Sequence, residues 1–262
     1  MSMQGKVYIV TGGSRGIGFS IAEALVAAGA KVGIIARSQS DVDTAAQQLG
    51  KDAIGFSAAV DNEAAVKPAI QNIHDHFGRL DGLVNNAGIA RPGTVQDIPI
   101  ADVIQTFAIN VIGTMNCIQA AVPLLHADNP RIVNISSASV THDDEMGHLA
   151  TYAASKAAVE RLSQDLRREL QEQEIGVTVV RPGSTPTEFA RDFDMDRTMR
   201  GFAAWQDRGP YMDTGMATED VAEAVRWCLA LPKGVASDIL EIRPNRRMSK
   251  MGEPGEGGNG KW

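Results

Sequence analysis

Two residues spaced four apart, Tyr152 and Lys156, follow a short apolar run that ends in Ser136 and Ser137. Because four residues make about one helical turn, the phenol and the ammonium are expected on the same face of a helix. A neighbouring positive charge favours the phenolate and lowers the pKa of a tyrosine from its ordinary value of ~10. Such a phenol can exchange a proton with an alcohol or carbonyl oxygen while the Ser137 hydroxyl hydrogen-bonds that oxygen. The pattern predicts acid/base chemistry beside a hydride carrier, although a Tyr-x-x-x-Lys pair taken alone is more often a solvated pair.

A glycine-rich loop is the first element that would position this chemistry. An apolar run over residues 6–10 is typical of a strand, and a helical pattern begins at Phe19. A glycine turn between a strand and a helix brings backbone close to a pyrophosphate and points a helix N-terminus at it. The spacing G-x-x-x-G-x-G is informative here because the loop directly follows the first strand, whereas an isolated glycine cluster is often an ordinary tight turn. The expected dinucleotide contacts are Gly12, Ser14, Arg15, Gly16, Ile17 and Gly18.

The end of the second expected strand, residues 31–36, indicates which dinucleotide would bind. In dinucleotide-binding folds this position carries an acidic residue for a free ribose hydroxyl, or an arginine for a 2′-phosphate. Ala36 supplies no carboxylate, and Arg37 follows it. Together with Arg15, Arg37 favours NADP(H), with NAD(H) as the alternative if both arginines are solvated.

The remaining pattern predicts an α/β protein. Strands and helices alternate about every 25 residues, which predicts a single-domain Rossmann fold with a doubly wound, seven-stranded parallel sheet flanked by helices. The expected strands occupy residues 6–10, 31–36, 53–59, 80–84, 133–135, 176–180 and 239–242. Ligands in such sheets bind beyond the carboxyl ends of the strands. The glycine loop, residues 85–88, Ser137 and residues 182–187 all fall at such ends.

Three further segments have expected roles. The dinucleotide-binding domain is expected over residues 1–250, with a substrate lid at about 188–216, where helical periodicity fades and aromatic residues are scattered. A pair of surface helices is an equal alternative for the lid. Residues 251–262 are glycine-rich and polar and are expected to form a flexible tail. Asn110, inside a helix expected over residues 101–127, either faces water, which is the commoner case, or holds a bend or a water near the site.

Composition excludes several functional classes. The 25 Lys and Arg residues against 32 Asp and Glu give a net charge of −7, which argues against a nucleic-acid or anionic-membrane surface. Cys117 and Cys228 lack metal-site spacing, so we expect two reduced core thiols and no metal. No secretory leader pattern opens the chain and no apolar run reaches membrane-spanning length, so a cytoplasmic protein is expected.

These motifs, in this order from residue 6 to about residue 244, strongly resemble the short-chain dehydrogenase/reductase family. The resemblance implies that Tyr152 is the acid/base, Ser137 orients the substrate oxygen, and Lys156 binds the nicotinamide ribose and lowers the tyrosine pKa. It implies that Asn110 holds a water in the proton relay. It also implies cofactor contacts from Val60 or Asp61, Asn86, Ala87, Gly88, Pro182, Gly183, Thr185 and Thr187.

Three departures from the family pattern leave alternatives open. Ser139 stands at the usual distance before Tyr152, so it is a rival for Ser137, which directly follows the strand. Ala59 replaces the Asp that often binds adenine, so the backbone of Val60 or the side chain of Asp61 takes that role. The loop over residues 142–148 is unusually polar, and its histidines are expected to be solvated rather than to touch substrate.

The sequence therefore predicts an NADP(H)-preferring oxidoreductase acting on a small carbonyl or secondary alcohol. A 3-hydroxy acid dehydrogenase or 3-oxoacyl reductase is one alternative, in which Arg191, Arg197, Arg200 and Arg208 form a carboxylate clamp. A catalytically silent NADP-binding regulator is another, and a methyltransferase would lack the Tyr152 and Lys156 pair. The resemblance also suggests a homodimer or homotetramer through the helices that begin near Ala101 and Thr151.

Overall fold

A computed structural model describes residues 3–141, 147–187, 193–208 and 215–246. Within these residues, seven strands form one sheet in the order β3-β2-β1-β4-β5-β6-β7, and every neighbouring pair is parallel. The strands are β1 Val7–Thr11, β2 Lys31–Ala36, β3 Ala53–Ser57, β4 Gly82–Asn85, β5 Arg131–Ile135, β6 Gly176–Pro182 and β7 Ile239–Ile242. The predicted doubly wound α/β fold is confirmed.

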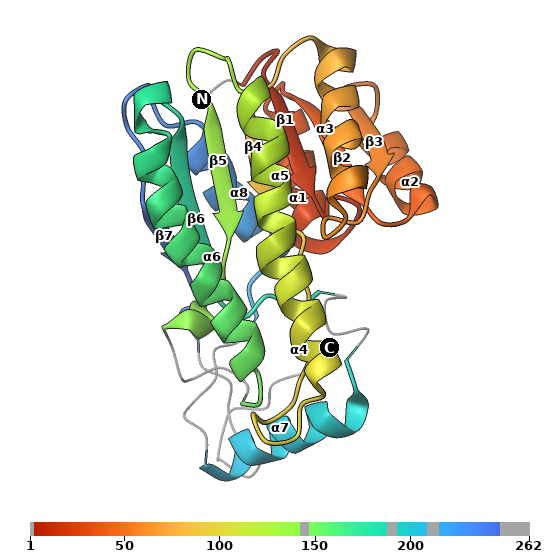
Figure 1. The fold of residues 1–262 in the computed structure, drawn as a ribbon, viewed down its shortest axis with the longest axis vertical. Coiled ribbons are helices and arrows are strands. Elements are labelled where there is room, and N and C mark those ends of the chain that lie inside the picture. The colour runs from red at the N-terminus through yellow and green to blue at the C-terminus, as the bar shows by residue number, and fades with distance from the viewer. Residues whose placement is uncertain (1–2, 142–146, 188–192, 209–214, 247–262) are drawn as a thin grey trace.

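Helices cover both faces of the sheet, so its central strands are buried and mostly apolar. The main helices are α1 Gly16–Ala27, α2 Gln39–Leu49, α3 Glu63–Phe77, α4 Ile100–Phe107, α5 Gly113–Ala121, α6 Ala150–Glu169, α7 Met195–Arg208 and α8 Thr218–Leu229. Figure 1 shows α3, α4, α5 and α6 in front of the sheet, with α1 and α8 behind it. Ile70 and Ile118 belong to the core on the first side, and Leu25 and Val225 to the core on the second. Burial on both faces explains the unbroken hydrophobic runs.

The order of the strands reverses between β1 and β4, and the ends of these two strands are joined by hydrogen bonds. The Thr11 hydroxyl accepts from the backbone N–H groups of Asn86 and Ala87, at 3.0 and 3.1 Å. The Asn86 side chain donates to the Thr11 carbonyl at 3.0 Å. These bonds place the turn over residues 85–88 beside the glycine loop, at the edge where such sheets bind ligands.

The long helix over Ile100–Leu124 contains a π-helical segment, η1 Ala108–Ile112, between α4 and α5. Asn110 lies in this segment and is only 1% exposed. Of the alternatives left open for Asn110, a position facing water is therefore excluded, and the residue is instead buried in a π-helical turn. A π-helical turn adds a residue to the helix and is frequent at functional sites.

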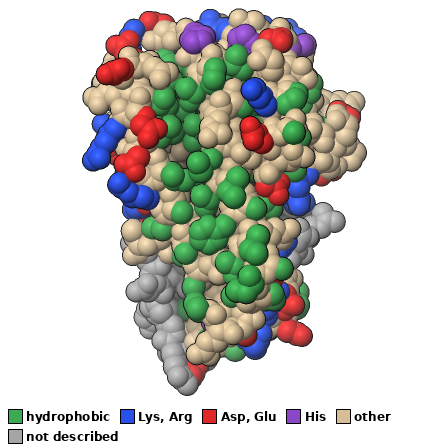
Figure 2. Space-filling model, viewed as in Figure 1, with side chains coloured by type: hydrophobic (Ala, Val, Ile, Leu, Met, Phe, Trp, Pro, Cys, Tyr) green, Lys and Arg blue, Asp and Glu red, His purple; other side chains and the backbone are tan. Residues whose placement is uncertain are grey.

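The same helix is long and apolar enough, by length and composition, to cross a membrane. The expectation that no segment reaches that length was wrong. One side of the helix packs against the core through Ile109, Cys117 and Ile118, beside α3. Its other side exposes Ile100, Ile104, Ile112 and Met115. Figure 2 shows hydrophobic side chains gathered over this face of the molecule.

Candidate functional site

A cleft of about 430 Å³ opens at the carboxyl ends of the strands. Its size falls within the range of roughly 300–1,000 Å³ that small-molecule sites occupy. All of the predicted site residues line it except Ser14 and Asn110. Those that line it are Gly12, Arg15, Gly16, Ile17, Gly18, Arg37, Val60, Asp61, Asn86, Ala87, Gly88, Ser137, Tyr152, Lys156, Pro182, Gly183, Thr185 and Thr187. Residues predicted from separate stretches of the chain thus meet in one place.

The glycine loop has the geometry of a phosphate cradle. Gly12 and Gly16 have φ angles of +65° and +53°, in the region that favours glycine. A Cβ at Gly18 would lie 2.2 Å from the Gly12 carbonyl oxygen, so no side chain fits there. The loop leads into α1, whose first backbone N–H groups have no partners within the helix. A flat, negatively charged ligand can therefore approach this backbone closely.

The end of β2 supplies positive charge and no carboxylate. Ala36 and the exposed Arg37 both line the cleft, as does Arg15 from the glycine loop. Val60 and Asp61 also line the cleft, and the Val60 carbonyl accepts from Asn116 at 2.9 Å. This end of the cleft suits a ligand with a phosphate.

Lys156 is buried in α6, with only 4% of its surface exposed. Its ammonium donates to the Ile135 carbonyl at 2.8 Å and lies 5.8 Å from the centre of the Tyr152 ring. Burial lowers the pKa of Lys156 to about 8, because a charge in a desolvated position is disfavoured. The two side chains lie on one face of α6 and both reach the cleft, as their spacing predicted.

Ser137 and Ser139 are hydrogen-bonded to each other. The Ser139 hydroxyl and its backbone N–H donate to the Ser137 hydroxyl oxygen, at 2.9 and 3.2 Å. Only Ser137 of the two lines the cleft. The Ser137 hydroxyl can therefore donate its own hydrogen to a group in the cleft, while Ser139, which does not line the cleft, donates to the Ser137 oxygen.

The Asn110 side chain joins three elements beneath the cleft. Its amide nitrogen donates to the Ile89 carbonyl at 2.8 Å and to the Ser155 hydroxyl at 2.9 Å, and its oxygen accepts from the Ile89 N–H at 2.8 Å. The Ser155 hydroxyl in turn donates to the Tyr152 carbonyl. Both amide hydrogens of Asn110 are thus used by protein, and the residue ties the turn after β4 to the start of α6.

Residues 6–198 match the sequence model of a family described as short chain dehydrogenase. That match covers well over half of the chain. This chain is a short-chain dehydrogenase.

Individual relatives agree with this family. The dehydrogenase is 37% identical over 203 residues to a 3-oxoacyl-(acyl-carrier-protein) reductase of rhamnolipid biosynthesis from Pseudomonas aeruginosa, covering 74% of this chain and 78% of that protein. Among solved structures, it resembles a short chain dehydrogenase from Burkholderia cenocepacia in complex with NADP, at 34% identity and a TM-score of 0.79, covering 93% and 98% of the two chains. A 3-ketoacyl-(acyl-carrier-protein) reductase from Brucella melitensis complexed with NADH gives a TM-score of 0.80 at 26% identity, covering 94% and 99%. The predicted family and the predicted class, an oxidoreductase acting on CH–OH groups and carbonyls, are confirmed.

Of the predicted carboxylate clamp, the two arginines whose side chains the structure describes, Arg197 and Arg200, do not face the cleft. Arg197 pairs with Asp102 at 2.8 Å, and Arg200 pairs with Asp97 at 2.9 Å, so their charges are used to attach α7 to α4 and the turn before it. Neither arginine lines the cleft. Arg191 and the side chain of Arg208 lie outside the described residues.

The lid segment contains a helix where periodicity had faded. Of the aromatic residues scattered along it, Phe193 lines the cleft, whereas Phe202 and Trp205 pack against each other with ring centroids 5.3 Å apart. Met195 and Met199 of α7 are exposed. Phe189, Tyr211, residues 142–146 and the tail lie outside the described residues, and His148 does not line the cleft.

Sequence reasoning missed several residues of the site. Arg91 and Leu149 line the cleft, and Ser155 joins Asn110 to α6. Glu160, four residues after Lys156, was also missed, although this spacing continues the face that carries Tyr152 and Lys156. That repeat of four was the available signal.

The buried ammonium of Lys156 makes the stability of the dehydrogenase depend on pH. Without nucleotide, the folded pKa of about 8 lies below the ordinary 10.5 of an unfolded chain, so unfolding takes up a proton between these values. The free energy of unfolding should therefore rise with pH in this window. Relative to Lys156→Met, we expect the wild type to gain roughly 2 kcal/mol between about pH 8 and 10, measured by urea denaturation. A difference that stays constant with pH would contradict this.

Proposed function

We propose that this dehydrogenase transfers a hydride between NADP(H) and a small carbonyl compound or secondary alcohol, with Tyr152 as the acid/base. The observation that carries the proposal is the convergence of Tyr152, Lys156 and Ser137 in one cleft with the glycine loop. Support also comes from solved relatives that hold NADP or NADH.

The residues of the chain supply the placement and the proton. In the reducing direction, the Tyr152 hydroxyl donates a proton to the substrate oxygen while the Ser137 hydroxyl hydrogen-bonds that oxygen. The Lys156 ammonium stabilises the phenolate that remains on Tyr152. The ammonium would itself hydrogen-bond water or a ribose hydroxyl of the cofactor. Asn110 holds Ile89 and Ser155 in place, and we propose that a water beside it completes the relay. The nicotinamide, when bound, supplies the hydride.

The cofactor would lie along the full length of the cleft. The pyrophosphate would be held by the loop from Gly12 to Gly18, and the 2′-phosphate by Arg15 and Arg37. Val60 or Asp61 would hold the adenine. The nicotinamide end would contact the residues at the ends of β4 and β6, which are Asn86, Ala87, Gly88, Pro182, Gly183, Thr185 and Thr187. Ser14, outside the cleft lining, would support the loop.

Tyr152→Phe tests the chemistry. Removing the hydroxyl leaves the ring and the fold but no proton donor, so kcat with NADPH and a carbonyl panel should fall by about 100-fold or more. NADPH affinity, measured by fluorescence titration, should stay within roughly twofold because the ring is retained. Turnover retained in the variant would refute the assignment, and a wild type that binds NADPH without reducing any carbonyl would favour the silent regulator.

Arg37→Ala tests the cofactor preference. Loss of the guanidinium should raise the KM for NADPH by roughly tenfold, because a charge-assisted bond to the 2′-phosphate is lost, and should leave the KM for NADH unchanged. Arg161→Ala, an exposed arginine on α6 away from the cleft, is the matched control. Equal effects on both cofactors would assign the preference to other residues.

A 3-oxoacyl compound is the second candidate substrate. Relatives include 3-oxoacyl-(acyl-carrier-protein) reductases, and the substrate end of the cleft is lined by Leu149 and Phe193 together with Arg91. An apolar wall with one guanidinium suits an acyl chain whose far end is polar. Rates on 3-oxoacyl thioesters, free 3-oxo acids and neutral ketones distinguish these substrates. We also propose that α7 belongs to the substrate lid of a single domain; the rest of the lid predicted over 188–216 lies partly, and the tail predicted over 251–262 wholly, outside the described residues.

We further propose that two copies of the dehydrogenase associate through the outer face of the helix over Ile100–Leu124 and the adjoining α6. Exposed fractions of 70% at Ile100, 64% at Ile104 and 51% at Ile112 leave an apolar surface larger than scattered single residues would give. Covering it in a homodimer or homotetramer, rather than inserting it in a bilayer, fits a helix whose other side packs in a protein core. The net charge of −7 argues against an anionic-membrane surface, and we propose a cytoplasmic enzyme.

Ile104→Glu combined with Ile112→Glu should separate the copies, because each charge would be buried without a partner in the interface. We expect light scattering after size exclusion to show an oligomer for the wild type and a monomer for the variant. Trp227→Glu, on the exposed surface of α8, is the control on the opposite face. A wild type that is monomeric at micromolar concentration would contradict the proposal.

A further inference from the structure

A cluster of paired charges lies beside the cleft, which only its Ser136 member lines, and the proposed chemistry does not use it. We call it the Glu160 cluster; it consists of Ser136, Glu160, Arg181 and Glu241. Glu160 is 5% exposed and sits on α6 one helical turn beyond Lys156. Ser136, Arg181 and Glu241 come from the ends of β5, β6 and β7. The cluster thus joins α6 to three strand ends.

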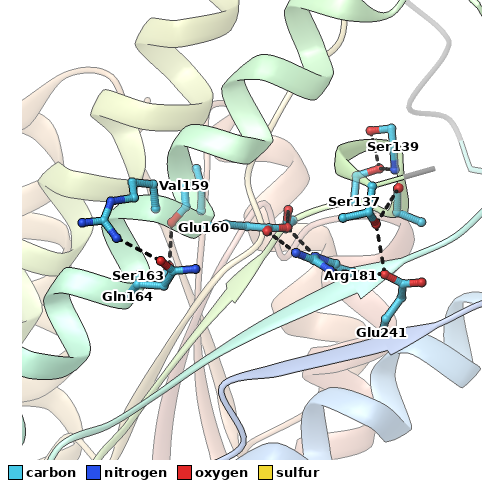
Figure 3. Close-up of polar contacts among 12 residues, drawn as sticks. Ser137, Ser139, Val159, Glu160, Ser163, Gln164, Arg181 and Glu241 are labelled. Atoms are coloured by element: carbon cyan, nitrogen blue, oxygen red, sulfur yellow. Dashed lines mark hydrogen bonds and ion pairs between the residues drawn. The ribbon is translucent and has the colours of Figure 1, made fainter. Parts of the chain in front are cut away.

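The contacts within the Glu160 cluster are short. The Glu160 carboxylate accepts from the Ser136 hydroxyl at 2.6 Å, and it holds the Arg181 guanidinium through two bonds of 2.7 and 2.5 Å. Arg181 also reaches Glu241 at 3.4 Å. Figure 3 shows Glu160 and Arg181 pointing at each other, with Glu241 on the far side of Arg181. A bidentate pair of this kind fixes orientation as well as distance.

Stability alone does not account for such a pair. Glu160 is buried and Arg181 is half-buried, and an ion pair removed from water is often no more stable than apolar side chains of the same volume. The Lys156 ammonium donates to the Ile135 carbonyl, whereas the Glu160 carboxylate accepts from Ser136 and Arg181. Its charge is instead used by Arg181.

The positions of the contacts indicate what the cluster does. Tyr152 lies on α6, whereas Ser137 lies at the end of β5, so the distance between their hydroxyls depends on how the helix is held against the strand. Two successive turns of α6 bind successive residues of that strand end: Lys156 binds the Ile135 carbonyl, and Glu160 binds the Ser136 hydroxyl. The next residue is Ser137.

We propose that Glu160 is a positioning residue for proton transfer: through Ser136 and Arg181 it holds Ser137 in register with Tyr152. This inference rests on the proposed function. Glu160 touches neither substrate nor cofactor, since it does not line the cleft. Arg181 directly precedes Pro182 and Gly183, so the same cluster also holds the loop at the end of β6.

Two variants separate positioning from stability. Ser136→Ala removes one hydrogen bond and leaves the Glu160 carboxylate paired with Arg181. Glu160→Leu combined with Arg181→Met replaces the ion pair by apolar groups of similar volume. In both we expect kcat to fall about tenfold, because misplaced groups lose alignment, while the KM for NADPH stays within roughly twofold. Ser136→Thr, which keeps the hydroxyl, should recover most of the kcat.

Glu223→Gln is the matched control, because it removes a carboxylate from the exposed side of α8, where Glu223 pairs with Arg226 at 2.6 Å. It should leave kcat and KM unchanged. Wild-type kcat in both Ser136→Ala and the double variant would overturn the positioning role while the proposed function stands. A parallel rise in the KM for NADPH would overturn it too, because that result indicates a general loosening of the site. A wild type that reduces no carbonyl would overturn the proposed function and this inference together.

Discussion

The structure around the cleft depends on a single buried ammonium. Lys156 is almost entirely buried, and among the described residues its ammonium donates to one acceptor, the Ile135 carbonyl. Removing this charge from water is costly, so it is held in place only because α6 packs along the sheet. The same burial places the ammonium near the Tyr152 ring and makes the lysine easier to deprotonate than a solvated one. Burying the ammonium thus lowers the free energy of unfolding, and it gives the protein a reactive pair of side chains.

The parallel sheet brings the other groups to that pair. Thr11 at the end of β1 binds the backbone of Asn86 and Ala87 after β4, which brings the glycine loop and the next turn together at the reversal of strand order. Every strand in the sheet points the same way, so loops from distant parts of the chain open on one edge. This arrangement makes one continuous cleft from short local motifs.

Polar side chains buried behind the cleft then set its dimensions. Asn110 uses its whole amide to join Ile89 to Ser155, and the π-helical turn is what directs it inward. Glu160 and Arg181 join α6 to β5 and β6. Fully hydrogen-bonded networks of this kind are rigid, and their partners restrict where each element can sit. The Arg197–Asp102 and Arg200–Asp97 pairs attach α7 to the rest of the protein, and the second pair is more exposed and therefore weaker.

The sequence by itself determined the features that arise from local spacing. The strand–glycine–helix order, the i, i+4 spacing of Tyr152 and Lys156, and the missing carboxylate after β2 can each be recognised within about ten residues. Only the tertiary structure decided the features that need partners far along the chain. Asn110 is buried because Ile89 and Ser155 come close enough to hydrogen-bond its amide. Arg197 pairs with Asp102 because α7 lies beside α4. The contacts of Glu160 depend on the positions of Ser136 and Arg181. Periodicity reports which face of a helix is apolar, whereas hydrogen bonds and ion pairs across the fold depend on packing that no local pattern encodes.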